Sequence, residues 1–167
     1  MRASVVRAVV IVALMTAVMT PAVAARPIAT LDGRAIAIER TSDLNCHDFE
    51  YPVIRCFDSV ASLESDFAAQ VARQNSRAFF AAESIGYVVA YEHATYQGAT
   101  KILTSDVPWL SDSGWNDRIS SFKSFGATGA FHEHSPSGGF IYSYGPSARV
   151  PSLSGTYNDK FSSFYIN

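Results

Sequence analysis

The sequence is poor in basic residues, in long apolar runs and in cysteines, and these scarcities narrow what the chain can be. Its 13 Lys and Arg residues are outnumbered by 15 Asp and Glu residues, which gives a net charge of −2 at neutral pH. A nucleic acid or an anionic membrane is therefore not expected as the main partner, because both are bound through excess positive charge. The sequence also offers no defensible Ser-His-Asp arrangement and no phosphate-binding glycine loop, so we expect no catalytic activity.

The one long apolar run lies at the N-terminus. The stretch AVVIVALMTAVM, 12 residues long, follows Arg2 and Arg7 and precedes the small residues of TPAVAA. This pattern is typical of a secretory signal peptide, and the run is too short to span a membrane. We therefore predict that residues 1–25 are a signal peptide cleaved near Ala24 or Ala25. The secreted, soluble remainder of about 142 residues would carry 11 basic and 15 acidic side chains.

The two cysteines, Cys46 and Cys56, lie ten positions apart in this remainder. An even pair at short spacing in an exported protein predicts a disulfide. Closing so short a loop stabilises the fold by roughly 2–3 kcal/mol on the chain-entropy model. The alternative is a cysteine hydrolase in which Cys46 is a nucleophile beside His47. Adjacent residues rarely form the thiolate–imidazole contact that such chemistry needs, so the disulfide is favoured.

Residues 26–86 are mixed in pattern, with one clear helix. Residues 33–40 alternate small apolar and polar side chains and are consistent with a short strand. Residues 58–75 predict a helix capped by Asp58 or Ser59, with Val60, Leu63, Phe67 and Val71 on one face, and we expect it to cover one face of a sheet. Residues 73–86 are ambiguous between a strand and a linker.

From residue 87 onward the chain repeats itself. Aromatic and β-branched residues alternate with polar ones, and turn residues interrupt them every 8–12 positions, as in an all-β sandwich or barrel. Residues 90–102 align with 131–143, and WNDRISSFKSF (115–125) aligns with YNDKFSSFYIN (157–167). Four antiparallel strands in about 40 residues form a Greek key, so two keys are expected to pack as a sandwich.

These residues resemble the βγ-crystallin family, in its secreted bacterial calcium-binding form. Tyr91, Tyr96 and Gly98 match the opening motif of a family Greek key, whereas the second key has His132 and Ser137 at its two aromatic positions and keeps Gly139. The family's calcium-binding hexad, Asn/Asp-Asn/Asp-x-x-Ser/Thr-Ser, occurs twice, at 116–121 and 158–163. The resemblance implies a mostly β protein: a βγ-crystallin-like double Greek-key sandwich over 87–167, with keys at 87–126 and 127–167. Residues 26–86 would form a small α-containing N-terminal extension.

The resemblance also implies calcium ligands shared crosswise between the two hexads. One site would use Glu92, Arg118 and Ser120 together with Asp159. The other would use Glu133, Lys160 and Ser162 together with Asp117. Asn116 and Asn158, which open the two hexads, are also candidate metal-site residues, and Arg118 and Lys160 can contribute only their carbonyls. Calcium takes six to eight oxygen ligands in flexible geometry, which such loops can offer, and one carboxylate per ion implies micromolar-to-millimolar affinity.

Several other interpretations remain open at this point. Asn-Asp before a strand is also ordinary turn chemistry. His132 and His134 lie on one side of a strand and could hold zinc if a third ligand were near. The fold resemblance also allows an inhibitor of extracellular proteases or an antimicrobial toxin, with 94–100 or 144–155 as the exposed loop. The sequence does not predict the oligomeric state.

Overall fold

A computed structural model describes residues 26–77 and 85–167 of this protein. The expected signal peptide, and most of the linker that follows the helix, lie outside the described residues. The strands are β1 (Ile28–Leu31), β2 (Arg34–Ile36), β3 (Asn45–Glu50), β4 (Val53–Phe57), β5 (Tyr87–His93), β6 (Gln97–Leu103), β7 (Ser121–Phe125), β8 (Gly129–His134), β9 (Gly138–Tyr144), β10 (Arg149–Val150) and β11 (Ser163–Ile166). The helices are α1 (Val60–Arg77) and the short 3-10 segments η1 (Ile38–Asp43), η2 (Ala94–Tyr96) and η3 (Leu110–Ser113).

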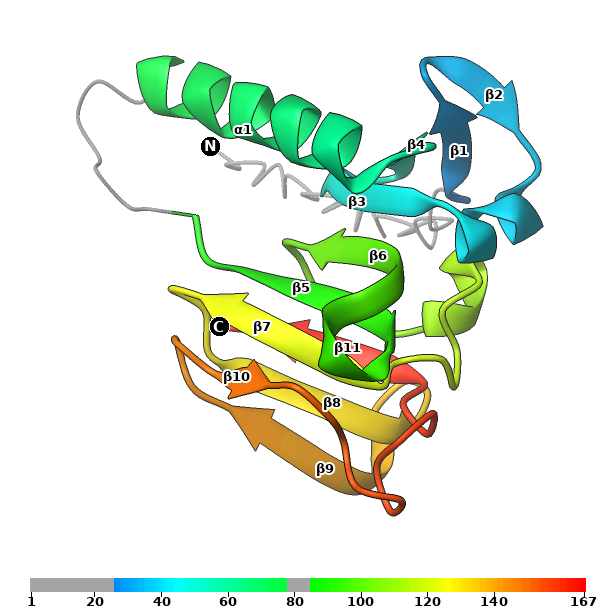
Figure 1. Ribbon diagram of the computed structural model, residues 1–167, viewed down its shortest axis with the longest axis vertical. Helices are drawn as coiled ribbons and strands as arrows, with labels where there is room; N and C mark the ends of the chain where they lie inside the picture. The colour runs from blue at the N-terminus through cyan, green and yellow to red at the C-terminus, as the bar shows by residue number, and fades with distance from the viewer. Residues whose placement is uncertain (1–25, 78–84) are drawn as a thin grey trace, which may run out of the picture.

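The strands form two sheets, and the N-terminal extension is built into the larger one. The order of the eight-stranded sheet is β10-β7-β5-β6-β3-β4-β1-β2, and that of the three-stranded sheet is β11-β8-β9. The junction is a short parallel pairing of β3 with β6, in which Cys46 lies opposite Lys101 and His47 opposite Ile102. Residues 26–57 therefore continue the sheet of the first repeat (Figure 1).

The third strand of each repeat crosses to the other sheet, which gives the Greek-key topology. In the second repeat, β10 leaves β8 and β9 and pairs with β7 of the first repeat. In the first repeat, the equivalent crossing is reduced to one bridge, in which Val107 pairs with Phe164 of β11. The expected four strands are thus present in the second repeat, whereas the first has three strands and a single bridging residue.

Aromatic side chains fill the space between the two sheets. Phe122, Phe131, Phe161 and Phe164 are fully buried, and the Phe131 ring lies 4.9 Å from Phe161 and 5.0 Å from Phe164, between centroids. Trp115, just before the first hexad, is also fully buried. The hexads therefore lie directly beside this buried aromatic core.

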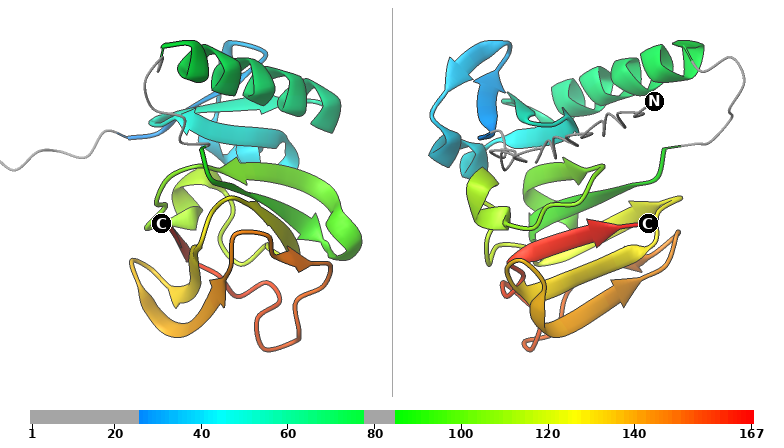
Figure 2. Two further views of the ribbon diagram at one scale, coloured as in Figure 1. Left: turned by 90° about the vertical axis from the view of Figure 1, so that its left-hand side faces the viewer. Right: turned by 180° about the vertical axis from the view of Figure 1, so that it is seen from behind.

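Helix α1 covers the opposite face of the large sheet, as predicted. The amide N of Ser62 donates to Ser59 Oγ at 3.1 Å, so Ser59 caps the helix. Leu63 and Phe67 are buried against Ile102 of β6, whereas Val60, at the first turn, is exposed. Figure 2 shows this helix at one end of the molecule and the three-stranded sheet at the other.

The cysteine pair forms the expected disulfide. Cys46 and Cys56 lie opposite each other on β3 and β4 and are bonded. Both are buried in a small cluster with Leu44 and Ile54. Cys46 has no free thiol, so the cysteine-hydrolase interpretation lacks its nucleophile. The strand expected over 33–40 is shorter than predicted, because the chain turns into η1 at Ile38.

Candidate functional site

The two hexads face each other, backbone to backbone. The amide N of Asp117 donates to the carbonyl O of Phe161 at 2.9 Å, and the amide N of Asp159 donates to the carbonyl O of Ile119 at 3.2 Å. The second residue of each hexad thus bonds to the fourth residue of the other. Asp117 and Ser162, which the crosswise hypothesis requires at the same end of the molecule, are connected through Phe161, the neighbour of Ser162.

The hexads also share an unusual local backbone shape. Asp117 and Asp159 have φ of 54° and 52°, in the left-handed region that few non-glycine residues enter. In each hexad the preceding side-chain amide donates to the Asp carboxylate at 2.7 Å, from Asn116 and from Asn158. Asp and Asn tolerate this conformation because their short side chains hydrogen-bond locally. The repeat is therefore one of geometry as well as of sequence.

One crosswise side-chain contact is present. Ser120 Oγ donates to Asp159 Oδ1 at 3.0 Å, so the hydroxyl of the first hexad reaches the carboxylate of the second. These are the two side chains expected to share one ion. Asp117 and Asp159 are both exposed, so their carboxylates are accessible from solvent.

The opening glutamates brace the hairpins with their carboxylates. Glu92 Oε2 accepts the amide N of Ala99, and Glu133 Oε2 accepts that of Phe140, each at 3.3 Å. Their backbone carbonyls, rather than their carboxylates, are thus the candidate ligands, in line with the resemblance. The guanidinium of Arg118 forms an ion pair with Glu92.

Further backbone bonds place each hexad beside the opening of its own repeat. The amide N of Ser120 donates to the carbonyl O of Tyr91 at 3.1 Å, and that of Ser162 donates to the carbonyl O of His132 at 2.9 Å. Tyr91 and His132 directly precede Glu92 and Glu133. Each Ser ligand candidate therefore lies next to the carbonyl-bearing segment expected to complete its site. Lys160 is exposed.

The second hairpin corner is preserved despite its divergent sequence. Gly139 has φ of 69° and Gly98 has φ of 81°. A Cβ at Gly139 would lie 2.6 Å from Glu133 Cβ, so the corner depends on this glycine. His132, which replaces the first aromatic residue, packs instead against the Tyr165 ring, with centroids 5.3 Å apart.

The structure also describes the residues of the zinc and loop alternatives. Within residues 26–77 and 85–167, no three His, Cys, Asp or Glu side chains gather in a group that could hold a metal. The 144–155 loop is fastened to the first repeat, because Gly126 N donates to Pro146 O at 2.8 Å and Thr95 N donates to Pro151 O at 2.6 Å.

Sequence reasoning missed a buried charged pair at the junction of the extension and the first repeat. Asp48 of β3 and Lys101 of β6 are 2% and 1% exposed. A sequence signal for this pair exists. Ala99, Lys101 and Leu103 share the apolar face of one strand, and Tyr142 occupies the position of Lys101 in the second repeat.

Two solved structures are similar to about half of this chain. Residues 87–167 have a βγ-crystallin-like double Greek-key fold. A βγ-crystallin from an archaeon is 34% identical, with a TM-score of 0.44, over 48% of this chain and 95% of its own. A clostrillin double mutant solved in complex with nickel is 28% identical, with a TM-score of 0.43, over 48% and 95%. The fold assignment rests on the crossing strands and not on these scores.

A curated relative matches a shorter part of the chain. The epidermal differentiation-specific protein of Cynops pyrrhogaster is 44% identical over 46 residues, which are 28% of this chain and 14% of that protein. The chain therefore covers only a small part of the relative's length. No family model matches the sequence. Among the described residues, no helix is long and apolar enough to cross a membrane.

Proposed function

We propose that this protein is a secreted calcium-binding βγ-crystallin-like protein in which calcium bridges the two hexads and stabilises the fold. One ion would be held by Ser120, Asp159 and carbonyls of Glu92 and Arg118. The second would be held by Ser162, Asp117 and carbonyls of Glu133 and Lys160. The expected partner is the ion itself, and the expected role is that of a binding module and not of an enzyme.

The single observation that supports the proposal best is the reciprocal pairing of the hexads. In each hexad the second residue donates its amide N–H to the carbonyl O of the fourth residue of the other hexad, and both aspartates have φ near 50°. Two unrelated turns would not be expected to share this arrangement. The Ser120–Asp159 contact adds a hydroxyl and a carboxylate from different repeats at one point. Hard cations such as calcium prefer this kind of oxygen cluster.

The donor set also predicts the strength of binding. Each proposed site has one carboxylate, from Asp117 or Asp159, and the remaining protein ligands are neutral oxygens. Affinity for calcium rises with ligand charge, so we expect dissociation constants in the micromolar-to-millimolar range of extracellular modules. A single site at ten times its dissociation constant adds about 1.4 kcal/mol to the free energy of unfolding.

Thermal unfolding with and without calcium tests the proposal. We expect millimolar calcium to raise the melting temperature of the wild type by about 5 °C per occupied site. Asp117→Ala and Asp159→Ala are each expected to remove about one site's share of this increase. Glu39→Ala is the matched control, because it removes an exposed carboxylate of the extension. A wild-type melting temperature that calcium leaves unchanged would contradict the proposal.

A further inference from the structure

The eight-stranded sheet is wider than the three-stranded sheet that packs on it. The part of its core-facing side that the smaller sheet does not cover borders a cavity. Lys101 lies opposite Cys46 on β3 and Ala90 on β5, so its side chain is on the same face as the buried core. Past β6 this face is roofed by the segment 106–113 instead of by strands. A cavity of about 310 Å³ lies between that segment and the sheet.

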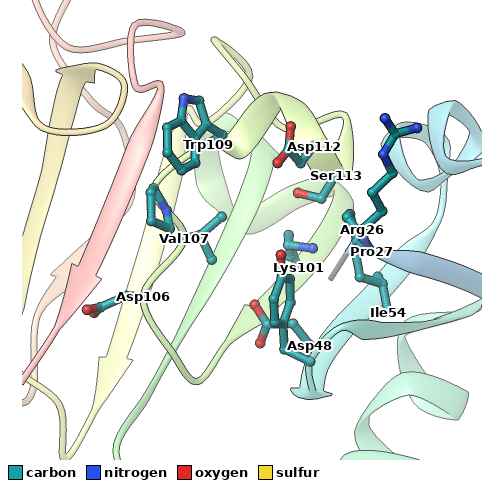
Figure 3. Close-up of a pocket in the computed structure, with 12 residues that line it drawn as sticks. Arg26, Pro27, Asp48, Ile54, Lys101, Asp106, Val107, Trp109, Asp112 and Ser113 are labelled. Carbon is teal, nitrogen blue, oxygen red and sulfur yellow. The ribbon is translucent and has the colours of Figure 1, made fainter. Parts of the chain in front are cut away.

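Five charged side chains line this cavity: Arg26, Asp106 and Asp112 are exposed, whereas Asp48 and Lys101 are almost fully buried. Among the residues that the structure describes, neither Lys101 Nζ nor Asp48 Oδ2 has a hydrogen-bond partner. The other oxygen of Asp48 accepts the amide N of Thr104 at 3.1 Å and its hydroxyl at 3.2 Å. Buried polar atoms without partners are rare because each costs about 1–3 kcal/mol. Figure 3 shows both side chains in the pocket, with Asp112 and Ser113 across from them.

Burial disfavours the charged form of both side chains. Burial lowers the pKa of the Lys101 ammonium, and attraction to Asp48 only opposes this effect. Burial likewise raises the pKa of the Asp48 carboxyl, against the attraction of Lys101 and the bonds from Thr104. A ligand that offered a negative group to one and a positive group to the other would stabilise both charged forms.

The rest of the lining combines apolar side chains with the exposed Arg26, Asp106 and Asp112 and the buried Ser113. Ile54 and Val107 are buried walls, whereas Trp109 and Tyr51 are 49% and 51% exposed. Exposed aromatic rings beside buried apolar walls indicate an open mouth leading to an enclosed interior. A small, mostly apolar pocket with a few convergent polar groups is typical of ligand sites, and this volume lies at the lower end of their range.

We propose that this cavity is a binding site for a small zwitterion with an apolar side chain, of the size of a free α-amino acid. The ligand carboxylate would accept a hydrogen bond from Lys101 Nζ, and its ammonium would donate to Asp48 Oδ2. The side chain would pack on Ile54, Val107 and Trp109. The site is separate from the hexads and does not depend on calcium.

Titration of the full chain with leucine, 4-methylpentanoate and 3-methylbutylamine tests the proposal. Binding is read by calorimetry and by tryptophan fluorescence. We expect leucine to bind at least tenfold more tightly than 4-methylpentanoate, which lacks the ammonium, or 3-methylbutylamine, which lacks the carboxylate. Lys101→Met and Asp48→Asn should each weaken leucine binding at least tenfold. Trp109→Ala, at the exposed mouth, should weaken it without unfolding the protein, and Glu39→Ala should change nothing.

Three outcomes would overturn the proposal. The first is the absence of binding by leucine, valine and phenylalanine up to about 10 mM. The second is that 4-methylpentanoate or 3-methylbutylamine binds as tightly as leucine. Asp48 or Lys101, respectively, would then make no contribution to binding. The third is unchanged leucine affinity in folded Trp109→Ala and Lys101→Met proteins, which would place any binding elsewhere.

Discussion

The substitution Gly139→Ala tests how much the second hairpin corner contributes to the free energy of unfolding. The residue has φ of 69°, and a Cβ there would lie 2.6 Å from Glu133 Cβ and would also overlap the Glu133 carboxylate. Left-handed backbone costs an alanine about 1–2 kcal/mol. Displacing the Glu133 carboxylate would also break its bond to the amide N of Phe140, and a hydrogen bond to a charged group contributes about 1.5–3 kcal/mol.

The expected loss is about 2–3 kcal/mol of unfolding free energy. It lies below the sum of the two terms, because Glu133 is 32% exposed and alanine also reduces the entropy of the unfolded chain. Urea denaturation should show a lower midpoint with an unchanged slope. Gly155→Ala is the control, since no atom of the described residues lies within 4 Å of a Cβ placed there. A Gly139→Ala protein within about 0.5 kcal/mol of this control would refute the reasoning.

Two further predictions concern the extension. Replacing Cys46 and Cys56 together by alanine should lower the unfolding free energy by roughly 2–3 kcal/mol in denaturant titrations, and an unchanged midpoint would argue against the disulfide's role. Burial lowers the pKa of His47 below 6.5 despite its contact with Asp66 at 2.9 Å, so the unfolded chain takes up this proton first as pH falls. Stability should therefore decrease from pH 6.5 down to the lowered pKa. A His47→Gln protein should show a flatter melting-temperature profile over this window, and parallel profiles would contradict the assignment.

Much of the fold was predictable because its signals are local or repeated. The period of apolar residues located α1, and the cysteine pair indicated the disulfide, because both depend on short stretches of chain. The duplicated hexads indicated two Greek keys, since two copies of one sequence pattern are expected to form the same structural unit. In the candidate site, the pairing of Ser120 with Asp159 followed from the family resemblance, and the structure brings these side chains together. Their role as calcium ligands stays a prediction.

The remaining features depend on contacts between distant segments. The sequence of β3 does not predict its pairing with β6, because parallel pairing between distant strands leaves no local sequence pattern. The single bridge at Val107 was hidden for the same reason. Lys101 was visible as a charged residue on an apolar strand face, yet only the tertiary structure shows that Asp48 shares its cavity.

The central claim is that each calcium ion is shared between repeats, and calorimetric titration of matched variants tests it most directly. Ser120 and Asp159 belong to different hexads, so the account predicts that Ser120→Ala and Asp159→Ala weaken the same site. The double variant should then keep one intact site, and Asp117→Ala should affect the other. If the Ser120→Ala and Asp159→Ala proteins instead each lose a different site, and the double variant loses both, calcium is not shared crosswise and the account is wrong.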